Sequence, residues 1–517
     1  MNTSTPRVDD EASFNAADHL INVNIVAGRG SKTAYIDNHG SYTYQQLKTL
    51  AQKTATALIN LGLREEERIL LCMTDSFEIP TTFLGAIYAG VIPVLTNTLL
   101  TQSDYAFMLA DSKAKIAIVS SGFSDTFLPL LESIDSLERI IFSDGKTGEL
   151  SEIITKSKCA PKSANTHADQ SCFWLYSSGS TGKPKGTIHV QTSMRDTARL
   201  YAQPVLNITS NDIVFSAAKL FFAYGLGNAL TFPILSGATT ILMEERPTPQ
   251  AVIRVLTEKK PTVFYGVPTL YAALLADESL PDPGQIALRI CTSAGEALPS
   301  DLSKQWYERF NINILDGIGS TEMLHIFLSN RQSDYKYGTT GKPLDGYALK
   351  ILNEDGAPVE EGELGELHVQ GPSMALMYWN NRKKSRGTFL GEWTRTGDKY
   401  RIDSEGYYIY CGRSDDMLKV GGIYVSPTEV ENTLTNHKAV LEAAVVAKSD
   451  DSGLVKPKAF VVLQTGFSPT PEMEETLKVY VKGELAPYKY PRWVSFVEDL
   501  SSYTHLRAHE TVLDLVC

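Results

Sequence analysis

Residues 176–186 bring together the kinds of side chain that bind phosphate. The stretch reads YSSGSTGKPKG and directly follows the apolar run at residues 172–176. Glycines let backbone N–H groups approach an anion, hydroxyls donate hydrogen bonds, and lysines add positive charge. The hydroxyl and lysine side chains are those of Ser177, Ser178, Ser180, Thr181, Lys183 and Lys185. We therefore predict a loop that binds phosphate groups.

The loop does not have the Walker spacing G-x-x-x-x-G-K-[ST]. Counted from Gly179, that spacing requires a second glycine where Pro184 stands. The alternative is a flexible Ser/Gly linker at the surface, but such linkers rarely combine lysines, a proline and a strand-like run before them. The phosphate-binding interpretation is therefore favoured.

The composition limits which classes of protein this chain can belong to. With 517 residues, 43% of them hydrophobic, the chain can bury several cores, so we expect two to four domains or subdomains. The net charge of −12 does not indicate the basic surface that binding of nucleic acid or anionic lipid requires. The six cysteines form no C-x-x-C pair, and residues 1–15 lack the pattern of a signal peptide. A cytoplasmic protein without structural zinc or disulfides is expected.

The elements that position the loop alternate between helix and strand. Helical segments and short apolar strands follow one another from residue 15 to about residue 322, which indicates layered, parallel α/β sheets. Several strand-like runs end in turns of small residues. In parallel sheets, ligands bind where the carboxyl ends of strands meet such turns. We expect a crevice built from residues 177–182, 221–227, 265–268, 293–296 and 317–322.

Residues 220–243 contain no charged side chain, so a membrane span has to be considered. Glycines and Pro233 interrupt the segment, which favours the buried core of an α/β domain instead. No membrane span is predicted.

The predicted pattern of secondary structure changes after Gly338. Shorter strands with charged turns indicate a β-rich subdomain, and polar residues with paired glycines at residues 414–422 mark a boundary. Beyond it, Ser426 and Pro427 with Glu429 form a helix start. The predicted fold class is α/β: a large N-terminal domain of layered sheets with a β-rich subdomain, and a small α+β C-terminal domain.

Three motifs in this order resemble the adenylate-forming superfamily of acyl-CoA synthetases, luciferases and peptide-synthetase adenylation domains. They are the phosphate-binding loop, residues 317–323 (GIGSTEM) and residues 393–400 (WTRTGDKY). The resemblance implies ATP, Mg²⁺ and coenzyme A as cofactors and co-substrates. It also implies an N-terminal domain over residues 1–413 and a mobile C-terminal domain over residues 414–500.

The resemblance assigns roles at the nucleotide. Thr321 would contact the α-phosphate, Glu322 would hold Mg²⁺, and Asp398, which the T-G-D sequence places after a glycine turn, would bind the ribose together with Arg413. The position of Ile318 is usually aromatic in the family, so stacking on adenine must be looser or come from elsewhere. The implied catalytic residues are Thr181, Lys185, Thr321, Glu322 and Lys419. The implied nucleotide contacts are Ser177, Ser178, Gly179, Ser180, Thr181, Gly182, Lys183, Gly295, Glu296, Ala297, Asp316, Gly317, Ile318, Thr321, Asp398 and Arg413.

Two of these motifs have structural alternatives when each is taken alone. A Thr-Glu pair can simply begin a helix, and T-G-D is usually just a turn. Asp415 matches the family's hinge, about which the small domain rotates between two half-reactions, and Lys419 would then face the active site during thiol transfer. The alternative for this segment is a solvated linker.

The acyl pocket is expected beside the α-phosphate, where small and aromatic residues suit a planar ring. The candidates are Phe222, Ala223, Tyr224, Gly225, Tyr265, Gly266, Gly319, His325 and Ile326. For His325, a satisfied core histidine is an equal alternative. Residues 219–228, 316–331, 377–381 and 485–493 resemble the benzoate–CoA and hydroxybenzoate–CoA ligases, and this likeness extends to about Leu500. It implies formation of an aryl-CoA from an aromatic acid by a monomer or homodimer.

The family pattern stops at residues 501–517. The family places a lysine there that reaches the α-phosphate, whereas the last lysine of this chain is Lys489. We therefore expect slow adenylation and a tail foreign to the family. Two alternatives stay open: an enzyme that loads a carrier protein, and a non-catalytic protein that binds an acyl-adenylate or a nucleotide.

Overall fold

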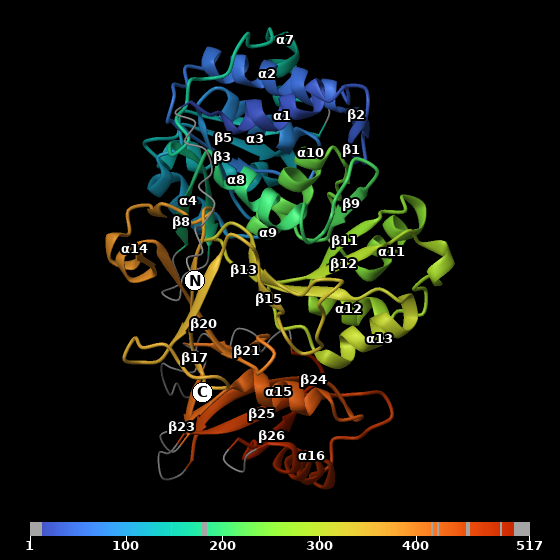
Figure 1. Cartoon of the computed structure of the whole chain (residues 1–517). Coiled ribbons are helices and arrows are strands. Elements are labelled where there is room, and N and C mark those ends of the chain that lie inside the picture. Colours follow the sequence, from blue (N-terminus) through green and yellow to red (C-terminus); the bar gives the residue numbers. More distant parts are fainter. Residues whose placement is uncertain are drawn as a thin grey trace. The chain divides into compact units, whose positions relative to one another are not determined.

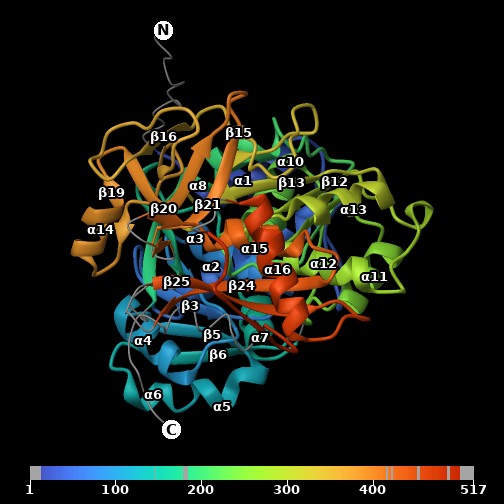
Figure 2. The same cartoon turned by 90° about the horizontal axis from the view of Figure 1, so that it is seen from below.

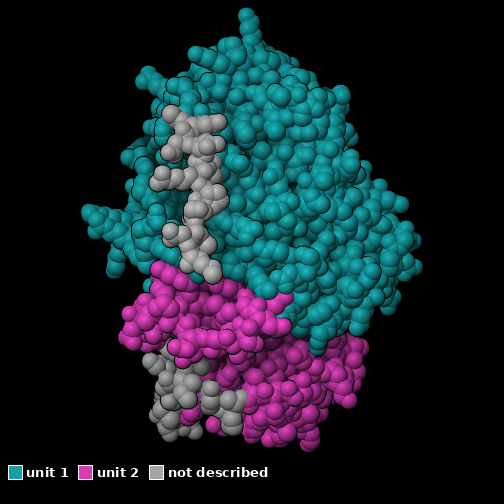
Figure 3. Space-filling view, in the orientation of Figure 1, with its two compact units in different colours: residues 1–349, 369–395 teal, residues 350–368, 396–517 magenta. Residues whose placement is uncertain are grey.

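The computed structural model describes residues 13–145, 147–177, 184–414, 417–420, 423–450, 455–485 and 489–500, without the side chains of Lys419, Ile423, Tyr424 and Ser449. The chain forms two compact units (Figure 3). Unit 1 comprises residues 1–349 and 369–395, and unit 2 comprises residues 350–368 and 396–517. These limits differ from the predicted boundary at residue 413, which stays a prediction.

The first sheet of unit 1 has the strand order β18-β8-β7-β4-β3-β5-β6. Strands β3 to β7 run parallel, whereas β8 pairs antiparallel with β7 and β18 pairs antiparallel with β8. The strands are β3 (Arg68–Cys72), β4 (Ile92–Leu95), β5 (Ile116–Ser120), β6 (Arg139–Ser143), β7 (Ser171–Ser177), β8 (Lys185–Val190) and β18 (Met377–Tyr378).

Helices cover both faces of this sheet. Along β3, Ile69 and Leu71 belong to one hydrophobic cluster, whereas Leu70 and Cys72 belong to another, because successive strand residues face opposite sides. The first cluster includes helices α1 (Ala16–Val26), α2 (Tyr44–Asn60) and α3 (Glu78–Tyr88), which lie together in Figure 1. The second includes α4 (Gln102–Ser112), α5 (Ser124–Phe127) and α6 (Leu130–Ser133), which Figure 2 shows on one side of β3, β5 and β6.

The second sheet of unit 1 has the order β15-β14-β13-β12-β11-β9-β10-β1-β2. The six strands from β13 to β1 in this order run parallel, and β2, β14 and β15 are antiparallel to their neighbours. The strands are β1 (Thr33–Asp37), β2 (Gly40–Thr43), β9 (Ile213–Ser216), β10 (Thr239–Ile241), β11 (Val263–Gly266), β12 (Ile290–Ser293), β13 (Ile314–Gly319), β14 (Ile326–Ser329) and β15 (Lys342–Pro343). The predicted turns of small residues thus follow neighbouring parallel strands, which confirms the α/β class.

The uncharged segment at residues 220–243 folds as short buried pieces. It contains α9 (Ala223–Leu226), a π-helix at Gly227–Thr231, α10 (Phe232–Ser236) and strand β10. Leu226, Leu230 and Ile234 belong to the core cluster of the first sheet. Among the described residues, no helix is both long and apolar enough to span a bilayer.

Among the described residues, unit 2 carries strands of three sheets: one that it shares with unit 1, where β19 lies, the pair β22 (Leu418–Val420) and β23 (Ile423–Val425), and a three-stranded sheet. One sheet has the order β16-β17-β20-β19 with β21 on β20, and the limits between the units fall within β16, β17 and β20. These strands are β16 (Ala348–Leu352), β17 (Gly365–Gln370), β19 (Phe389–Leu390), β20 (Trp393–Ile402) and β21 (Tyr408–Arg413).

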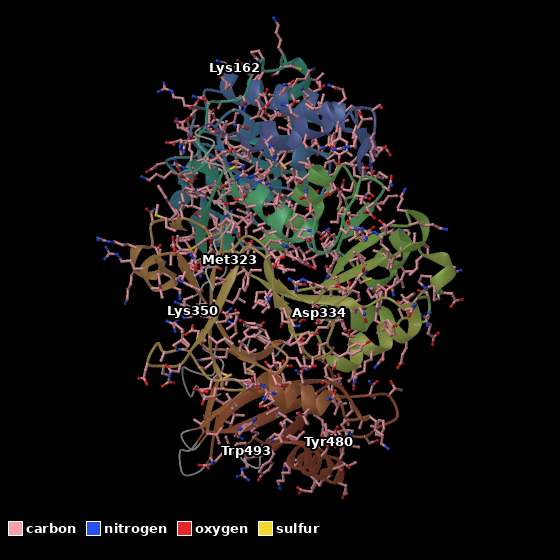
Figure 4. The ribbon with its side chains drawn as sticks, viewed as in Figure 1. Lys162, Met323, Asp334, Lys350, Tyr480 and Trp493 are labelled. Carbon is pink, nitrogen blue, oxygen red and sulfur yellow. The ribbon has the colours of Figure 1, made fainter. Side chains whose placement is uncertain are left out.

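The C-terminal part of unit 2 is an α+β module, as predicted. A three-stranded sheet of β24 (Val440–Ser449), β25 (Val455–Leu463) and β26 (Trp493–Phe496) packs with α15 (Pro427–Thr435) and α16 (Pro471–Glu484). Figure 4 labels Tyr480 on α16 and Trp493 on β26. The Ser426 side chain accepts a hydrogen bond from the backbone N–H of Glu429, which confirms the predicted helix start.

Candidate active site

The predicted phosphate-binding loop joins the antiparallel strands β7 and β8. Ser177 is the last residue of β7 and pairs across the ladder with Lys185, the first residue of β8. The Ser177 hydroxyl is buried and finds no partner among the residues that the structure describes. Six predicted loop residues lie outside the described part of the chain: Ser178, Gly179, Ser180, Thr181, Gly182 and Lys183.

Lys185 and Glu322, predicted to serve the phosphates and Mg²⁺, lie together in unit 1. The Lys185 ammonium is 3.8 Å from Glu322 Oε1, and both side chains are largely buried. The Tyr378 hydroxyl donates a hydrogen bond of 2.5 Å to the same oxygen, Glu322 Oε1. Lys185 Nζ also lies 3.4 Å from that hydroxyl and 4.5 Å from the centre of the Tyr378 ring.

The loop that carries Glu322 is held at several backbone atoms. His189 Nε2 is 2.8 Å from the carbonyl oxygen of Thr321, and the N–H of Ala375 donates to the carbonyl of Glu322 at 2.8 Å. The Ser373 hydroxyl donates to the carbonyl of Met323, a buried residue labelled in Figure 4. Burial lowers the pKa of His189 from 6.5 to about 4, so its ring is neutral at pH 7 and Nε2–H donates to Thr321.

Strand β13 carries the predicted nucleotide residues Asp316, Gly317 and Ile318. Burial raises the pKa of the Asp316 carboxyl to about 8, and its Oδ1 has no partner in the described residues. Such an atom can hydrogen-bond a bound ligand. The other predicted adenine contacts, Gly295, Glu296 and Ala297, follow β12 in a turn where Gly295 has φ +92°.

His325 lies in an aromatic cluster. Its ring centre is 4.4 Å from that of Phe232, 5.5 Å from Tyr224 and 5.6 Å from Tyr201. Nε2 is 3.1 Å from Asn228 Oδ1 and 3.3 Å from the carbonyl of Tyr224. Burial lowers the pKa of His325 to about 3, so this ring is also neutral at pH 7.

Other predicted pocket residues border this cluster. The Tyr224 and Tyr265 rings meet edge to face with centres 6.2 Å apart, and the Tyr224 hydroxyl is 2.6 Å from Thr292 Oγ1. Three glycines are sterically required: a Cβ would come within 2.0 Å of the Lys219 carbonyl at Gly225, 2.7 Å of the Tyr271 ring at Gly266 and 2.6 Å of the His325 backbone at Gly319.

The remaining predicted pocket residues lie at the ends of the same elements. Phe222 precedes α9, is 48% exposed and has its ring centre 4.6 Å from that of Phe221. Ala223 begins α9, and Ile326 begins β14, where its side chain fills the space beside Gly317. The place of Phe222 and Ala223 in the acyl pocket stays a prediction.

The chain matches the family model of AMP-binding enzymes over residues 24–379. It belongs to the AMP-binding enzyme family. The model of the AMP-binding enzyme C-terminal domain also matches, over residues 429–505. The resemblance to the adenylate-forming superfamily is thereby confirmed.

Two relatives and one solved structure are similar to this AMP-binding enzyme over nearly their whole length. The benzoate–CoA ligase of Thauera aromatica is 55% identical, covering 96% of this chain and 94% of that protein. A 4-hydroxybenzoate–CoA/benzoate–CoA ligase of Rhodopseudomonas palustris is 44% identical, covering 94% and 91%. A crystal structure of a benzoate CoA ligase from Burkholderia xenovorans LB400 has a TM-score of 0.89 at 53% identity, covering 94% of this chain and 97% of that one.

The predicted ribose contacts of this AMP-binding enzyme lie in unit 2. Asp398 on β20 faces Arg413 on β21, and Arg413 Nη1 donates to Asp398 Oδ1 at 3.1 Å. The prediction that Asp398 follows a glycine turn is wrong. Gly397 and Asp398 lie within β20, where Gly397 has φ +78°. Asp415 and the side chain of Lys419 lie outside the described residues.

Sequence reasoning missed several residues that shape the site: Tyr378, His189 and Asn228. Tyr378 belongs to the MYWNN sequence at residues 377–381, which was noted only as part of the resemblance. His189 and Asn228 carried no signal, because each acts through a partner more than ninety positions away.

Proposed function

We propose that this AMP-binding enzyme activates an aromatic carboxylate, benzoate or a substituted benzoate, with ATP and transfers the acyl group to coenzyme A. The products are an aryl-CoA, AMP and diphosphate. The relatives named for benzoate and 4-hydroxybenzoate support this proposal. Activation is needed because a carboxylate is a poor acyl donor, whereas AMP is a good leaving group.

One observation carries the proposal: the charged pair and the aromatic cluster share one short loop. Glu322 is paired with Lys185, and only Met323 and Leu324 separate it from His325. An aromatic acid whose ring lies against His325 and Tyr224 would therefore present its carboxylate toward the phosphate side. Bringing the carboxylate and the α-phosphate together supplies much of the rate enhancement.

The donor set beside Lys185 fits a magnesium ion that arrives with ATP. The structure, over its described residues, contains no group of three or more His, Cys, Asp or Glu side chains placed to hold a metal. Mg²⁺ usually binds through one or two carboxylates together with substrate phosphates, and Glu322 is such a carboxylate. When bound, Mg²⁺ neutralises phosphate charge.

The chain's own groups act on the developing charge. Lys185 places an ammonium where negative charge grows on the α-phosphate, and the Thr321 and Thr181 hydroxyls donate hydrogen bonds to its oxygens. The other predicted residues of the phosphate-binding loop and of β13 position the nucleotide, with Asp398 and Arg413 at the ribose. Lys419, beyond the hinge at Asp415, serves thiol transfer.

The pocket favours a flat, uncharged ring. His325, Tyr224 and Tyr265 present aromatic faces and edges, and the glycines at positions 225, 266 and 319 leave no room for larger side chains. Because the His325 ring is neutral, it offers no cation to hold the substrate carboxylate. The carboxylate is therefore left to the phosphate side of the site.

Benzoate-dependent release of pyrophosphate from ATP, measured with and without coenzyme A, tests the proposal. We expect release that depends on an aromatic acid, and AMP release that accelerates with coenzyme A. Acceleration by an acyl-carrier protein alone would favour a carrier-loading enzyme. Binding of ATP and benzoate without any pyrophosphate would favour a non-catalytic binder and contradict the proposal.

The setting of the reaction is part of the proposal. A monomer or homodimer in the cytoplasm suits a chain with net charge −12 and no C-x-x-C pair. Sedimentation of the purified protein measures the oligomeric state directly.

A further inference from the structure

Tyr378 contacts both charged side chains of the site. It lies on β18, is 2% exposed, and donates its hydroxyl hydrogen to Glu322 Oε1 at 2.5 Å. The same hydroxyl oxygen is 3.4 Å from Lys185 Nζ, which also lies over the ring face, 4.5 Å from its centre. A single tyrosine therefore fixes an anion through its proton and a cation through its oxygen and ring.

These contacts give the two oxygens of the Glu322 carboxylate different surroundings. A phenol has one hydrogen to donate, and it is used on Oε1, the oxygen that also faces Lys185. Within the described part of the chain, both contacts of this carboxylate fall on Oε1. Oε2 is the oxygen that a cation can bind without displacing either neighbour.

Tyr378 is well suited to this task because its backbone is tied to the strand that carries Lys185. Tyr378 pairs with Thr187 across the antiparallel β18–β8 ladder. The next residue, Trp379, donates its N–H to the carbonyl of Gly186 at 2.8 Å and its indole N–H to the carbonyl of Asp111 at 2.8 Å. The hydroxyl position is thus set by the sheet rather than by a free loop.

We propose that Tyr378 is a positioning residue for the adenylation reaction: it orients Glu322 so that Oε2 receives the Mg²⁺ of the nucleotide, and it holds Lys185 beside the phosphates. This inference rests on the proposed function. It assigns Tyr378 no contact with the substrate and no share in proton transfer.

The test measures binding of α,β-methylene-ATP, which cannot be cleaved at the reacting bond, by calorimetry with Mg²⁺ and with EDTA. Tyr378→Phe keeps the ring over Lys185 and removes only the hydroxyl. We expect it to weaken binding of the Mg²⁺ complex about tenfold, the loss of one hydrogen bond to a charged group, with little change in EDTA. In a Glu322→Gln background, Tyr378→Phe should have a much smaller effect, because the charged hydrogen bond to Glu322 is already lost and the phenylalanine ring still covers Lys185.

Tyr44→Phe is the matched control. Tyr44 is 1% exposed in the same unit, and its hydroxyl donates to the carbonyl of Ala238 at 2.6 Å, with the carbonyl of Pro233 at 3.1 Å. Its loss therefore removes a comparable buried hydroxyl that does not bond to Glu322. Equal weakening by both variants, equal weakening with and without Mg²⁺, or an undiminished effect in Glu322→Gln would each overturn the inference. If the unaltered protein fails to bind the Mg²⁺ complex at all, the proposed function itself fails.

Discussion

Gly227 makes room for the His325 ring. A Cβ at residue 227 would lie 2.3 Å from His325 Cδ2, closer than any van der Waals contact permits. The ring is confined on its other sides by Phe232, Tyr224 and Tyr201, so it cannot move away without disturbing the cluster. The geometry of the aromatic pocket therefore depends on the absence of a side chain at Gly227.

We predict that Gly227→Ala raises the KM for benzoate about tenfold and leaves the KM for ATP nearly unchanged. The methyl group would push the His325 ring toward the ring-binding space, and overpacking of this kind costs about 1–3 kcal/mol. Steady-state kinetics with each substrate varied in turn measure the two constants. Gly387→Ala, at a glycine of α14 (Arg382–Thr388) with no neighbour within 4 Å of the added Cβ, is the control. A parallel rise in both constants would show that the change is not confined to the acyl pocket.

At the scale of elements, strands β8 and β18 contact the loop at residues 320–324, and these contacts form the centre of the site. Strand β8 contributes Lys185 at its start and His189 near its end, and the segment at residues 373–378 contributes Ser373, Ala375 and Tyr378. Each of these residues holds an atom of the loop or the Glu322 side chain. The loop backbone is thus held at the carbonyls of Thr321, Glu322 and Met323.

His189 makes the stability of the folded protein dependent on pH. Its folded pKa of about 4 lies below the 6.5 of the unfolded chain, so above pH 6.5 both states are neutral. As pH falls from 6.5 toward 4, the unfolded chain binds a proton that the folded protein does not, and stability is lost. We predict a loss of about 2 kcal/mol at pH 5 from this residue.

His189→Gln keeps a donor for the Thr321 carbonyl but does not titrate. Urea unfolding at pH 7 and pH 5 should show a smaller difference in midpoint for this variant than for the unaltered protein. His167→Gln, at an exposed histidine, should leave the difference unchanged. An unchanged difference in His189→Gln would mean that another group carries the pH dependence.

Local patterns in the sequence predict the helices and strands well. They predict poorly the contacts of β8 and β18 with the loop at residues 320–324. Strands β7 and β11 to β13 and the Ser426 cap of α15 each have a signal within a few residues. Lys185 and Glu322 were singled out from motifs, and the structure places their side chains 3.8 Å apart, whereas their roles stay predictions. Tyr378 could not be assigned, because its role depends on the β18–β8 pairing across the chain. The T-G-D sequence misled because a glycine with positive φ also occurs inside a strand.

At the scale of the whole molecule, the residues predicted to bind the nucleotide and to serve catalysis are divided between the two compact units. Lys185, Glu322 and His325 belong to unit 1, whereas Asp398, Arg413 and Lys419 belong to unit 2. Adenylation requires space for pyrophosphate at the acyl carbonyl, and thiol transfer requires a path for coenzyme A to the same carbon. One fixed arrangement cannot serve both, so a reaction of this type calls for movement between the half-reactions.

We predict that Asp415→Pro separates the two half-reactions. Proline fixes φ near −65° and removes a rotation at the expected hinge. Conversion of benzoyl-AMP with coenzyme A to benzoyl-CoA should fall at least about tenfold, while benzoate-dependent pyrophosphate exchange should fall much less. Both rates are measured on the same preparation. A proline at Asp403 would be no suitable control, because the Asp403 side chain accepts hydrogen bonds in a turn. Asp415→Ala, which leaves φ free, is the proper control and should retain both rates. Equal loss of the two rates in Asp415→Pro would mean that residue 415 does not control a movement needed by only one half-reaction.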